Sequence, residues 1–359
     1  MREPAEVRRR RILAVVQSRG SARVSDLAAE LEVSVVTVRR DVEELGRSGL
    51  LRRGHGVVRP VVPVARPDRA AAPYDRGAAV AVVVPERHIY LNEALHGARG
   101  VLEEAGVRVA LHIAPQAAGA ERSIVDSALA GGARGLLVAP RWSGADEEAE
   151  ARWPAETGVP TVLMERRPER GGPLHAVDSV CSDHWYGVHL AVEHLVALGH
   201  RRIVLAARDD SPTARAVRAA FTGIAAARPE IEDWCVVLSA PAPLDLAALL
   251  RARRATGALL HGDVDALMLV QQLADAGVRV PQDCSVVAYD DVVAALGSVP
   301  LTAVAPPKAE VGRAAAELLL RRLAFEHGTA TVPEAVRRVE LLPELKVRGS
   351  AQPPPAVPG

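Results

Sequence analysis

Aromatic side chains are scarce in this sequence: 4 Trp, 4 Tyr and 2 Phe make up 3% of 359 residues. The core must therefore be built from Ala, Val and Leu, which favours buried parallel strands and helices over an all-β sandwich. Cysteine is also scarce, and Cys181, Cys235 and Cys284 have neither C-x-x-C spacing nor a pairing pattern. No zinc site or disulfide framework is indicated, which fits a reducing cytoplasm.

Long apolar runs are missing as well. Arg8 to Arg11 are not followed by the apolar stretch of a signal peptide, and no segment of membrane-spanning length is free of charge. We therefore expect a cytoplasmic protein that does not enter a membrane. The chain also has no nucleophile elbow, phosphate loop, Rossmann glycine pattern or zinc signature. We expect neither an enzyme nor a cofactor.

Charge is balanced over the whole chain but not along it. The formal net charge is zero, while residues 1–60 contain 13 Arg against 8 Asp or Glu. The N-terminal segment is therefore basic and the remainder acidic, which suits a polyanionic partner at one end. With 49% hydrophobic and 25% charged residues, the chain has a globular composition, and its length favours more than one domain.

Composition divides the chain into four parts. Residues 1–60 are rich in Arg, and residues 61–77 are rich in Pro, Arg and Ala without apolar periodicity, as in a linker. From residue 78 to 346, short apolar runs such as 80–84 alternate with amphipathic stretches, which is the pattern of βαβ units and an α/β fold. We predict that residues 347–359 form a disordered tail.

The first part predicts a helix-turn-helix. Apolar residues at helical spacing indicate two helices around residues 12–16 and 27–31 and a third that contains Val38, Val42 and Leu45. Ser34 stands where it would cap the third helix. The β-prone segment 50–59, with Gly54-His55-Gly56 at its centre, predicts a hairpin wing. This geometry fits a DNA major groove, although a solvated Arg-rich helical bundle is the alternative.

Two strings in this part resemble the winged helix of the DeoR family. They are VSVVTVRRDVEEL at 33–45 and GLLRRGHG at 49–56, and the resemblance covers about residues 8–59. It implies that double-stranded operator DNA is a partner. The residues expected to contact DNA are Ser34, Thr37, Arg39, Arg40, Arg52, Arg53 and His55.

Three segments of the α/β region resemble LacI/GalR regulators: LAVEHLVALGHRRI at 190–203, RVPQDCSVVAYDD at 279–291 and PLT at 300–302. The resemblance implies a periplasmic-binding-protein-like fold, with two α/β lobes, three crossovers and a ligand cleft between the lobes. It places lobe 1 at about 78–178 and 303–325, and lobe 2 at about 179–302 and 326–346. The LacI-type head and hinge helix are absent, so the combination is a hybrid.

The same resemblance implies where a ligand would bind. Carboxylates, arginines and an aromatic ring at strand-to-helix connections would bond to and stack on a sugar. The candidates are Tyr90, Glu165, Arg166, Asp183, Arg218, Asp263 and Asp290, with Arg141 and Trp142 ranked below them. Structural alternatives exist, because Asp290 could end a strand and Arg218 could form a surface ion pair. Gly262 stands where the family usually has Asn, so one amide contact would be missing.

Together these features predict a transcriptional repressor, a homodimer whose operator affinity is set by a small carbohydrate-like effector, such as a sugar, polyol or nucleoside. An exported sugar-binding protein of a transporter and a sugar-acting enzyme are the alternatives. The histidines at 184, 189, 194 and 200 are spaced 5, 5 and 6 residues apart, which does not place them on one helical face. No metal site is predicted.

Overall fold

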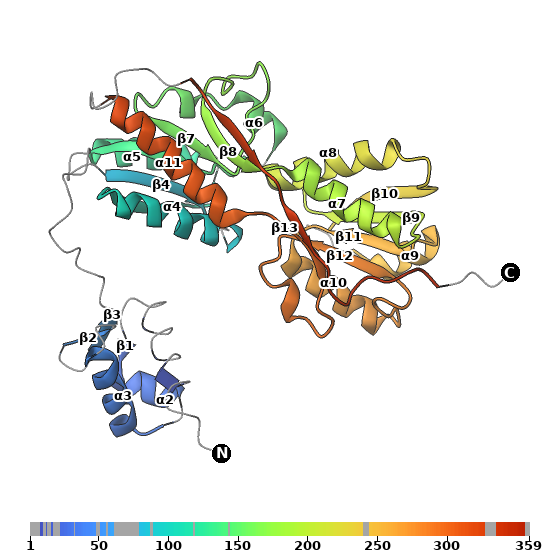
Figure 1. The fold of residues 1–359 in the computed structure, drawn as a ribbon, viewed down its shortest axis with the longest axis horizontal. Helices are drawn as coiled ribbons and strands as arrows, with labels where there is room; N and C mark the ends of the chain where they lie inside the picture. The colour runs from blue at the N-terminus through green and yellow to red at the C-terminus, as the bar shows by residue number, and fades with distance from the viewer. Residues whose placement is uncertain are drawn as a thin grey trace. The chain divides into compact units, whose positions relative to one another are not determined.

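The computed structural model describes residues 8–9, 12, 16, 22–31, 33–47, 51–54, 57–60, 79–86, 89–117, 119–142, 144–239, 244–326 and 335–355. The chain forms two compact units, residues 1–70 and 71–359, and most of their helices and strands are labelled in Figure 1. The predicted linker at 61–77 lies outside the described residues.

The N-terminal unit packs short helices on a small antiparallel sheet. Its elements are β1 (Ala22–Arg23), α2 (Val24–Glu30), α3 (Val35–Arg47), β2 (Leu51–Gly54) and β3 (Val57–Pro60). The sheet order is β1-β3-β2, and the β2–β3 hairpin pairs Gly54 with Val57. Residues 8, 9, 12 and 16 are helical. The predicted helix-turn-helix and wing are therefore present.

Apolar residues at helical spacing hold this unit together. Ile12 and Val16 are fully buried against a core that includes Leu27, Val38 and Val42. The Thr37 amide donates to Ser34 Oγ at 3.2 Å, so Ser34 caps α3 as predicted. The buried carboxylate of Asp41 accepts from Nε of Arg8 at 2.6 Å and of Arg9 at 3.0 Å, which fixes α3 against these two helical residues.

Two sheets form two lobes in the second unit (Figure 1). Among the described residues, the lobe 1 sheet has the order β14-β8-β7-β6-β4-β5, and all its pairs are parallel. Its elements are β4 (Ala79–Pro85), η1 (Ile89–Leu91), α4 (Asn92–Glu104), β5 (Arg108–Ala114), α5 (Ala120–Ala130), β6 (Ala133–Val138), α6 (Ala145–Glu150), η2 (Trp153–Ala155), β7 (Thr161–Met164), β8 (Asp178–Ser182), α11 (Lys308–Glu326) and β14 (Arg338–Leu341).

The lobe 2 sheet has the order β10-β9-β11-β12-β13-β15, and only its β13–β15 pair is antiparallel among the described strands. Its elements are α7 (His184–Ala197), β9 (Arg202–Ala207), α8 (Pro212–Ala226), β10 (Asp233–Leu238), α9 (Leu246–Arg253), β11 (Gly257–Leu260), α10 (Asp263–Asp275), β12 (Ser285–Tyr289), η3 (Ala294–Leu296), β13 (Thr302–Ala305) and β15 (Glu344–Lys346). Strands β11 and β12 are completely buried, as expected of parallel strands covered on both faces.

The chain passes between the lobes after β8, after β13 and after β14. These crossovers shift the predicted lobe boundaries. Strand β13 belongs to lobe 2, whereas we expected residues from 303 onward in lobe 1. Strand β14 belongs to lobe 1, whereas we expected residues 326–346 in lobe 2. The reason is that β13 pairs with β12 and β14 pairs with β8, which sequence similarity along the chain does not reveal.

Helices α4 and α11 of lobe 1 lie in unusually close contact. A Cβ atom on Gly97 would be 2.2 Å from the Ala309 carbonyl oxygen, and one on Gly312 would be 1.8 Å from that of Ala94. Only glycine fits at these two positions. These two close contacts therefore fix the first turns of α11, which begins at Lys308, against α4.

The predicted disordered tail is wrong for residues 347–355. Ser350 is fully buried, where its hydroxyl donates to the Val286 carbonyl at 2.6 Å and accepts from the Thr302 amide at 2.8 Å. The Gln352 carbonyl accepts from Ser285 Oγ at 2.9 Å. The tail is held because its polar groups complete hydrogen bonds at the amino-terminal ends of β12 and β13. Within the described residues, no helix is long and apolar enough to cross a membrane.

Candidate ligand cleft and DNA-binding surface

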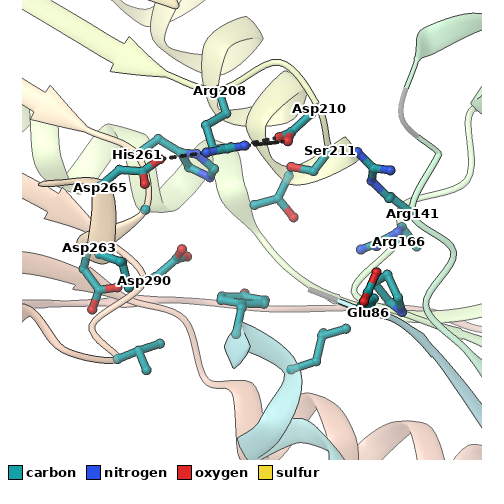
Figure 2. Close-up of a pocket in the computed structure, with 17 residues that line it drawn as sticks. Glu86, Arg141, Arg166, Arg208, Asp210, Ser211, His261, Asp263, Asp265 and Asp290 are labelled. Carbon is teal, nitrogen blue, oxygen red and sulfur yellow. Dashed lines mark hydrogen bonds and ion pairs between the residues drawn. The ribbon is translucent and has the colours of Figure 1, made fainter. Parts of the chain in front are cut away.

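A cavity of about 490 Å³ lies between the lobes at the carboxyl ends of their parallel strands. Its lining comes from the connections after β4, β6 and β7 in lobe 1 and after β9, β11 and β12 in lobe 2 (Figure 2). Open α/β sheets bind ligands at this edge, because the strand-to-helix loops converge there. Three arginines and five carboxylates are among the lining residues.

Arg166 lines the cavity but is held by backbone carbonyl groups. Its side chain donates to the carbonyl of Pro140, to that of Glu165 at 2.6 Å and to that of Ala139 at 3.4 Å. Burial lowers the pKa of Arg166 to about 10, so the guanidinium stays charged at neutral pH. The residue therefore connects the ends of β6 and β7, and three of its five donors are directed to the backbone.

Arg208 is held by two carboxylates on the lobe 2 side of the cavity. Its Nη2 lies 2.8 Å from Asp210 Oδ2, and its Nη1 lies 3.4 Å from Asp265 Oδ2, as Figure 2 shows. The hydrogen bonds from Arg208 hold the pKa of Asp210 below its usual value. The charge of Arg141 acts on Asp210 in the same direction. The charge of Arg208 is thus already balanced by protein carboxylates.

Asp290 and His261 present unpaired polar atoms to the cavity. Among the described residues, Asp290 Oδ1 and both ring nitrogens of His261 are buried without a hydrogen-bond partner. Burial raises the pKa of Asp290 to about 7, opposed by the nearby charge of Lys308. Burial lowers the pKa of His261 to about 4, so its imidazole is neutral at pH 7.

Glu165 lies behind the cavity and orders its wall. Its carboxylate accepts from Ser182 Oγ at 2.8 Å and lies 3.7 Å from Nε2 of His184. The other ring nitrogen of His184 lies 3.0 Å from the Tyr289 hydroxyl. Burial raises the pKa of Glu165 and lowers that of His184 to about 3. Because Glu165 follows β7 in lobe 1 and Tyr289 ends β12 in lobe 2, this polar chain links the lobes.

Backbone strain is concentrated at these strand ends. Four residues other than glycine around the cleft have positive φ: Trp142 at 38°, Glu165 at 54°, Asp290 at 105° and Asp291 at 52°. L-residues rarely adopt such conformations unless the surrounding structure enforces them, and strain of this kind is typical of functional sites.

Two contacts join the lobes beside the cavity. Arg215 of α8 donates to the Trp142 carbonyl at 2.8 Å and pairs with Glu148 of α6 at 2.7 Å. Lys308, the first residue of α11, is 3% exposed and donates to the backbone carbonyl of Asp290. Its Nζ also lies 5.3 Å from the ring centroid of Tyr90. Asp290 therefore contacts the first residue after the crossover from β13 in lobe 2 to α11 in lobe 1.

The structure brings four of the seven predicted ligand residues to the cavity: Tyr90, Arg166, Asp263 and Asp290. Glu165 lies behind the wall, as described above. Asp183 caps α7 by accepting from the Tyr186 amide at 2.9 Å, and it is not among the lining residues. Arg218 lies 3.6 Å from Asp209 in an ion pair, which is its structural alternative. Asp263 uses Oδ2 to accept from the amides of Val293 and Ala294.

Sequence reasoning missed several lining residues: Glu86, Arg208, Asp210, Ser211, Thr213, His261 and Asp265. Arg141, ranked low, also lines the cavity. A usable signal was present, because Arg208 and His261 directly follow the buried strands β9 and β11. Parallel strands place such residues at a common edge.

The recognition helix α3 exposes part of the predicted DNA-binding set. Arg39 and Arg40 are exposed, Thr37 is half-buried, and Ser34 is exposed at the cap. Val36, in the first turn, is 73% exposed, which is unusual for a large apolar residue. Arg52 and Arg53 belong to β2, where their side chains are not described, and His55 lies outside the described residues.

Comparisons with known proteins agree with this division. Residues 192–351 match the family model of a periplasmic-binding-protein-like domain, and residues 8–61 match that of a DeoR-like helix-turn-helix domain. The HTH-type transcriptional repressor PurR of Aliivibrio fischeri strain MJ11 is 29% identical over 226 residues, covering 59% of this chain and 65% of that repressor. The chain thus spans slightly less than two-thirds of this relative.

Two solved structures share the fold. A LacI family transcriptional regulator from Enterococcus faecium with bound ribose has a TM-score of 0.60 at 22% identity, covering 77% of this chain and 99% of that one. The CelR–cellobiose complex has a TM-score of 0.62 at 24% identity, covering 88% and 90%. The second unit is therefore a periplasmic-binding-protein-like core. In this core the chain is similar to LacI/GalR-type regulators, and residues 8–61 match a DeoR-like helix-turn-helix domain, which agrees with both resemblances.

Proposed function

We propose that this protein is a DNA-binding transcriptional repressor whose operator affinity is set by a small carbohydrate-like effector bound between the lobes. One observation carries the proposal: a single chain holds an exposed recognition helix and a cleft lined by unpaired polar groups. Ribose and cellobiose in the two solved neighbours support the carbohydrate class. The relative with 29% identity is a repressor rather than an enzyme, which supports a sensing role over catalysis.

Helix α3 would enter the major groove of the operator. Arg39 and Arg40 would reach base edges from its exposed side, and Ser34 would order the first turn. The β2–β3 wing, with Arg52 and Arg53, would contact phosphates. Such an activity belongs where the chromosome lies, in the cytoplasm.

Ligand control follows from linkage between two sites. A ligand that contacts both lobes favours their closed arrangement, and the crossovers after β8, β13 and β14 are the segments that would bend. The contacts of Lys308 and Arg215 would change with closure, because each joins one lobe to the other. A coupling of about 1–3 kcal/mol is enough for a 5- to 150-fold change in operator affinity.

A second copy of the chain would be the protein partner. Edge strand β5 exposes Leu111 by 51% and Ile113 by 48%, and an exposed apolar sheet edge favours association. A dimer would place two recognition helices on two half-sites, which a monomer cannot do.

The proposal is tested by selecting DNA from a random pool with the full-length protein and measuring operator affinity with and without candidate effectors. We expect one enriched motif with two half-sites and an affinity change of at least fivefold with one effector. Enrichment of no motif would refute the regulatory role. A motif whose affinity no carbohydrate-like compound alters would refute the effector class.

A further inference from the structure

Three side chains that line the cavity have buried polar atoms that the protein leaves unpaired. Among the described residues, the Tyr90 hydroxyl, Asp290 Oδ1 and both ring nitrogens of His261 have no hydrogen-bond partner. Figure 2 shows His261 and Asp290 at the same open space. Buried polar atoms in folded proteins almost always have partners. Four unpaired atoms at one cavity indicate that a ligand supplies the missing bonds.

These groups match hydroxyls better than charged groups. A carboxylate accepts hydrogen bonds, and a neutral imidazole donates one and accepts one. A hydroxyl does both, so two neighbouring hydroxyls of a ligand satisfy His261 and Asp290 together. His261 is 7% exposed, which leaves no water-facing alternative for its ring.

Two of the three arginines that line the cavity are already held by protein groups. Arg166 is bonded to three carbonyl groups, and Arg208 is paired with Asp210 and Asp265. Arg141 lies in the field of Asp210. Asp290 Oδ1 has no hydrogen-bond partner in the same space, so a dianionic group there would repel the ionised form of this carboxyl group.

Because residue 262 is glycine, His261 supplies the polar side chain of the connection between β11 and α10. Gly262 adopts φ +81°, and a Cβ atom there would have nothing within 4 Å. This connection between β11 and α10 thus offers the cavity an imidazole followed by a residue without a side chain.

We propose, building on the effector site inferred above, that the cavity binds a polyhydroxylated ligand without negative charge, rejects the phosphate esters of such ligands, and uses His261 as its specificity-determining residue. Asp290 accepts from one ligand hydroxyl. His261 donates to and accepts from the neighbouring ones.

The first test needs no ligand and compares two histidines. His200 is as buried as His261, but its ring nitrogens lie 2.8 Å from Thr256 Oγ1 and 3.0 Å from the Gln352 carbonyl oxygen. His200→Leu removes satisfied bonds and lowers the melting temperature by several degrees. His261→Leu removes only unpaired atoms, so the melting temperature stays unchanged or rises. An equal loss of stability in both variants, or failure of only His261→Leu to fold, would refute a ligand role for His261.

The second test measures binding by calorimetry with matched pairs of compounds: ribose and ribose 5-phosphate, glucose and glucose 6-phosphate, adenosine and its 5′-phosphate. We expect at least one uncharged compound to bind, its phosphate ester to bind at least tenfold more weakly, and His261→Leu to lose at least tenfold in affinity. His261→Asn, which keeps a donor and an acceptor, restores part of it.

Tighter binding of any phosphate ester than of its parent would overturn the ligand class, and wild-type affinity in His261→Leu would overturn the role of His261. If no compound binds, the comparison of the two leucine variants decides the role of His261. Binding of the selected operator DNA by the same protein samples tests the regulatory function separately.

Discussion

Asp290 has a buried carboxyl whose pKa is raised to about 7, mainly by burial, from a usual value of 3.8. Between pH 4 and pH 7 the folded protein therefore keeps a proton that the unfolded chain has released. By linkage, this group's contribution to the free energy of unfolding falls as pH rises through that range and is constant above it. Ligand-free protein carries the full effect.

We predict that Asp290→Asn removes this pH dependence. The stability of the variant relative to wild type, measured by urea unfolding of the core, should rise by a few kcal/mol from pH 5 to pH 8, at about 1.4 kcal/mol per pKa unit. His184 and His261 act oppositely below pH 6.5, because burial lowers their pKa values. Both histidines are present in the variant and in wild type, so their effect cancels in the difference between the two free energies of unfolding. A constant difference across this range would show that Asp290 is ionised throughout.

The recognition helix leads to a prediction about Arg40. It is exposed on α3, in the unit of residues 1–70, which folds apart from the cleft. Arg40→Ala should weaken binding to the selected operator by about 1–3 kcal/mol without changing the thermal shift caused by a ligand. Arg52→Ala should weaken all DNA sequences alike and reduce the salt slope by about one unit. Unchanged operator affinity in Arg40→Ala, measured by fluorescence anisotropy, would contradict the assignment of α3.

Single residues show how far the sequence predicts the site. Tyr90, Arg166, Asp263 and Asp290 line the cavity, and the resemblance assigns them to strand-to-helix connections. His261 was not found, because a similarity argument transfers residue types that match and passes over a type that differs. Arg218, which the resemblance also assigns to the cleft, lies 3.6 Å from Asp209 in an ion pair and is not among the lining residues. Helical periodicity does not determine which of these positions the side chain takes.

At the scale of elements, the contact between α4 and α11 is a sharp constraint. Gly97 faces the Ala309 carbonyl oxygen, whereas a Cβ atom on Gly100, three residues later on α4, would have nothing within 4 Å. We predict that Gly97→Ala lowers the free energy of unfolding by about 1–3 kcal/mol or more, because backbone must move. Gly100→Ala should raise it by about 0.5–1 kcal/mol, because alanine favours a helix. Equal effects in denaturant unfolding would refute the close approach.

The elements themselves follow largely from sequence, and their partners do not. The apolar run at 80–84 becomes β4, and the capping position at Ser34 begins α3. The short strand β14 carries no mark of its partner, because its pairing with β8 joins residues more than 150 positions apart. The tail at 347–355 was misjudged for the same reason, since Ser350 is fixed by Val286 and Thr302 rather than by its neighbours.

At the scale of the whole molecule, the proposed regulation requires coupling between the two units. LacI/GalR regulators, which this chain resembles, have a hinge helix between head and core. In this chain, Pro63, Pro67 and Pro73 would deny such a helix its amide donors. The two units would then communicate through the length of residues 61–77 rather than through a helix in the minor groove. The length of the linker would then determine how far a movement of the lobes changes the spacing of the two N-terminal units of a dimer on DNA.

We predict that inserting four to six Gly and Ser residues between Pro67 and Pro73 blunts the effector response and leaves operator affinity without effector nearly unchanged. The insertion adds slack, which lowers the free energy by which lobe closure shifts the heads, while each head keeps its own DNA contacts. Operator affinity with and without effector, measured by fluorescence anisotropy, gives the coupling as a ratio. Replacing Arg52, Arg53 and Arg59 together by Ala is the matched opposite, because it should reduce affinity in both states and leave that ratio intact. A full effector response in the lengthened protein would show that coupling does not depend on the linker.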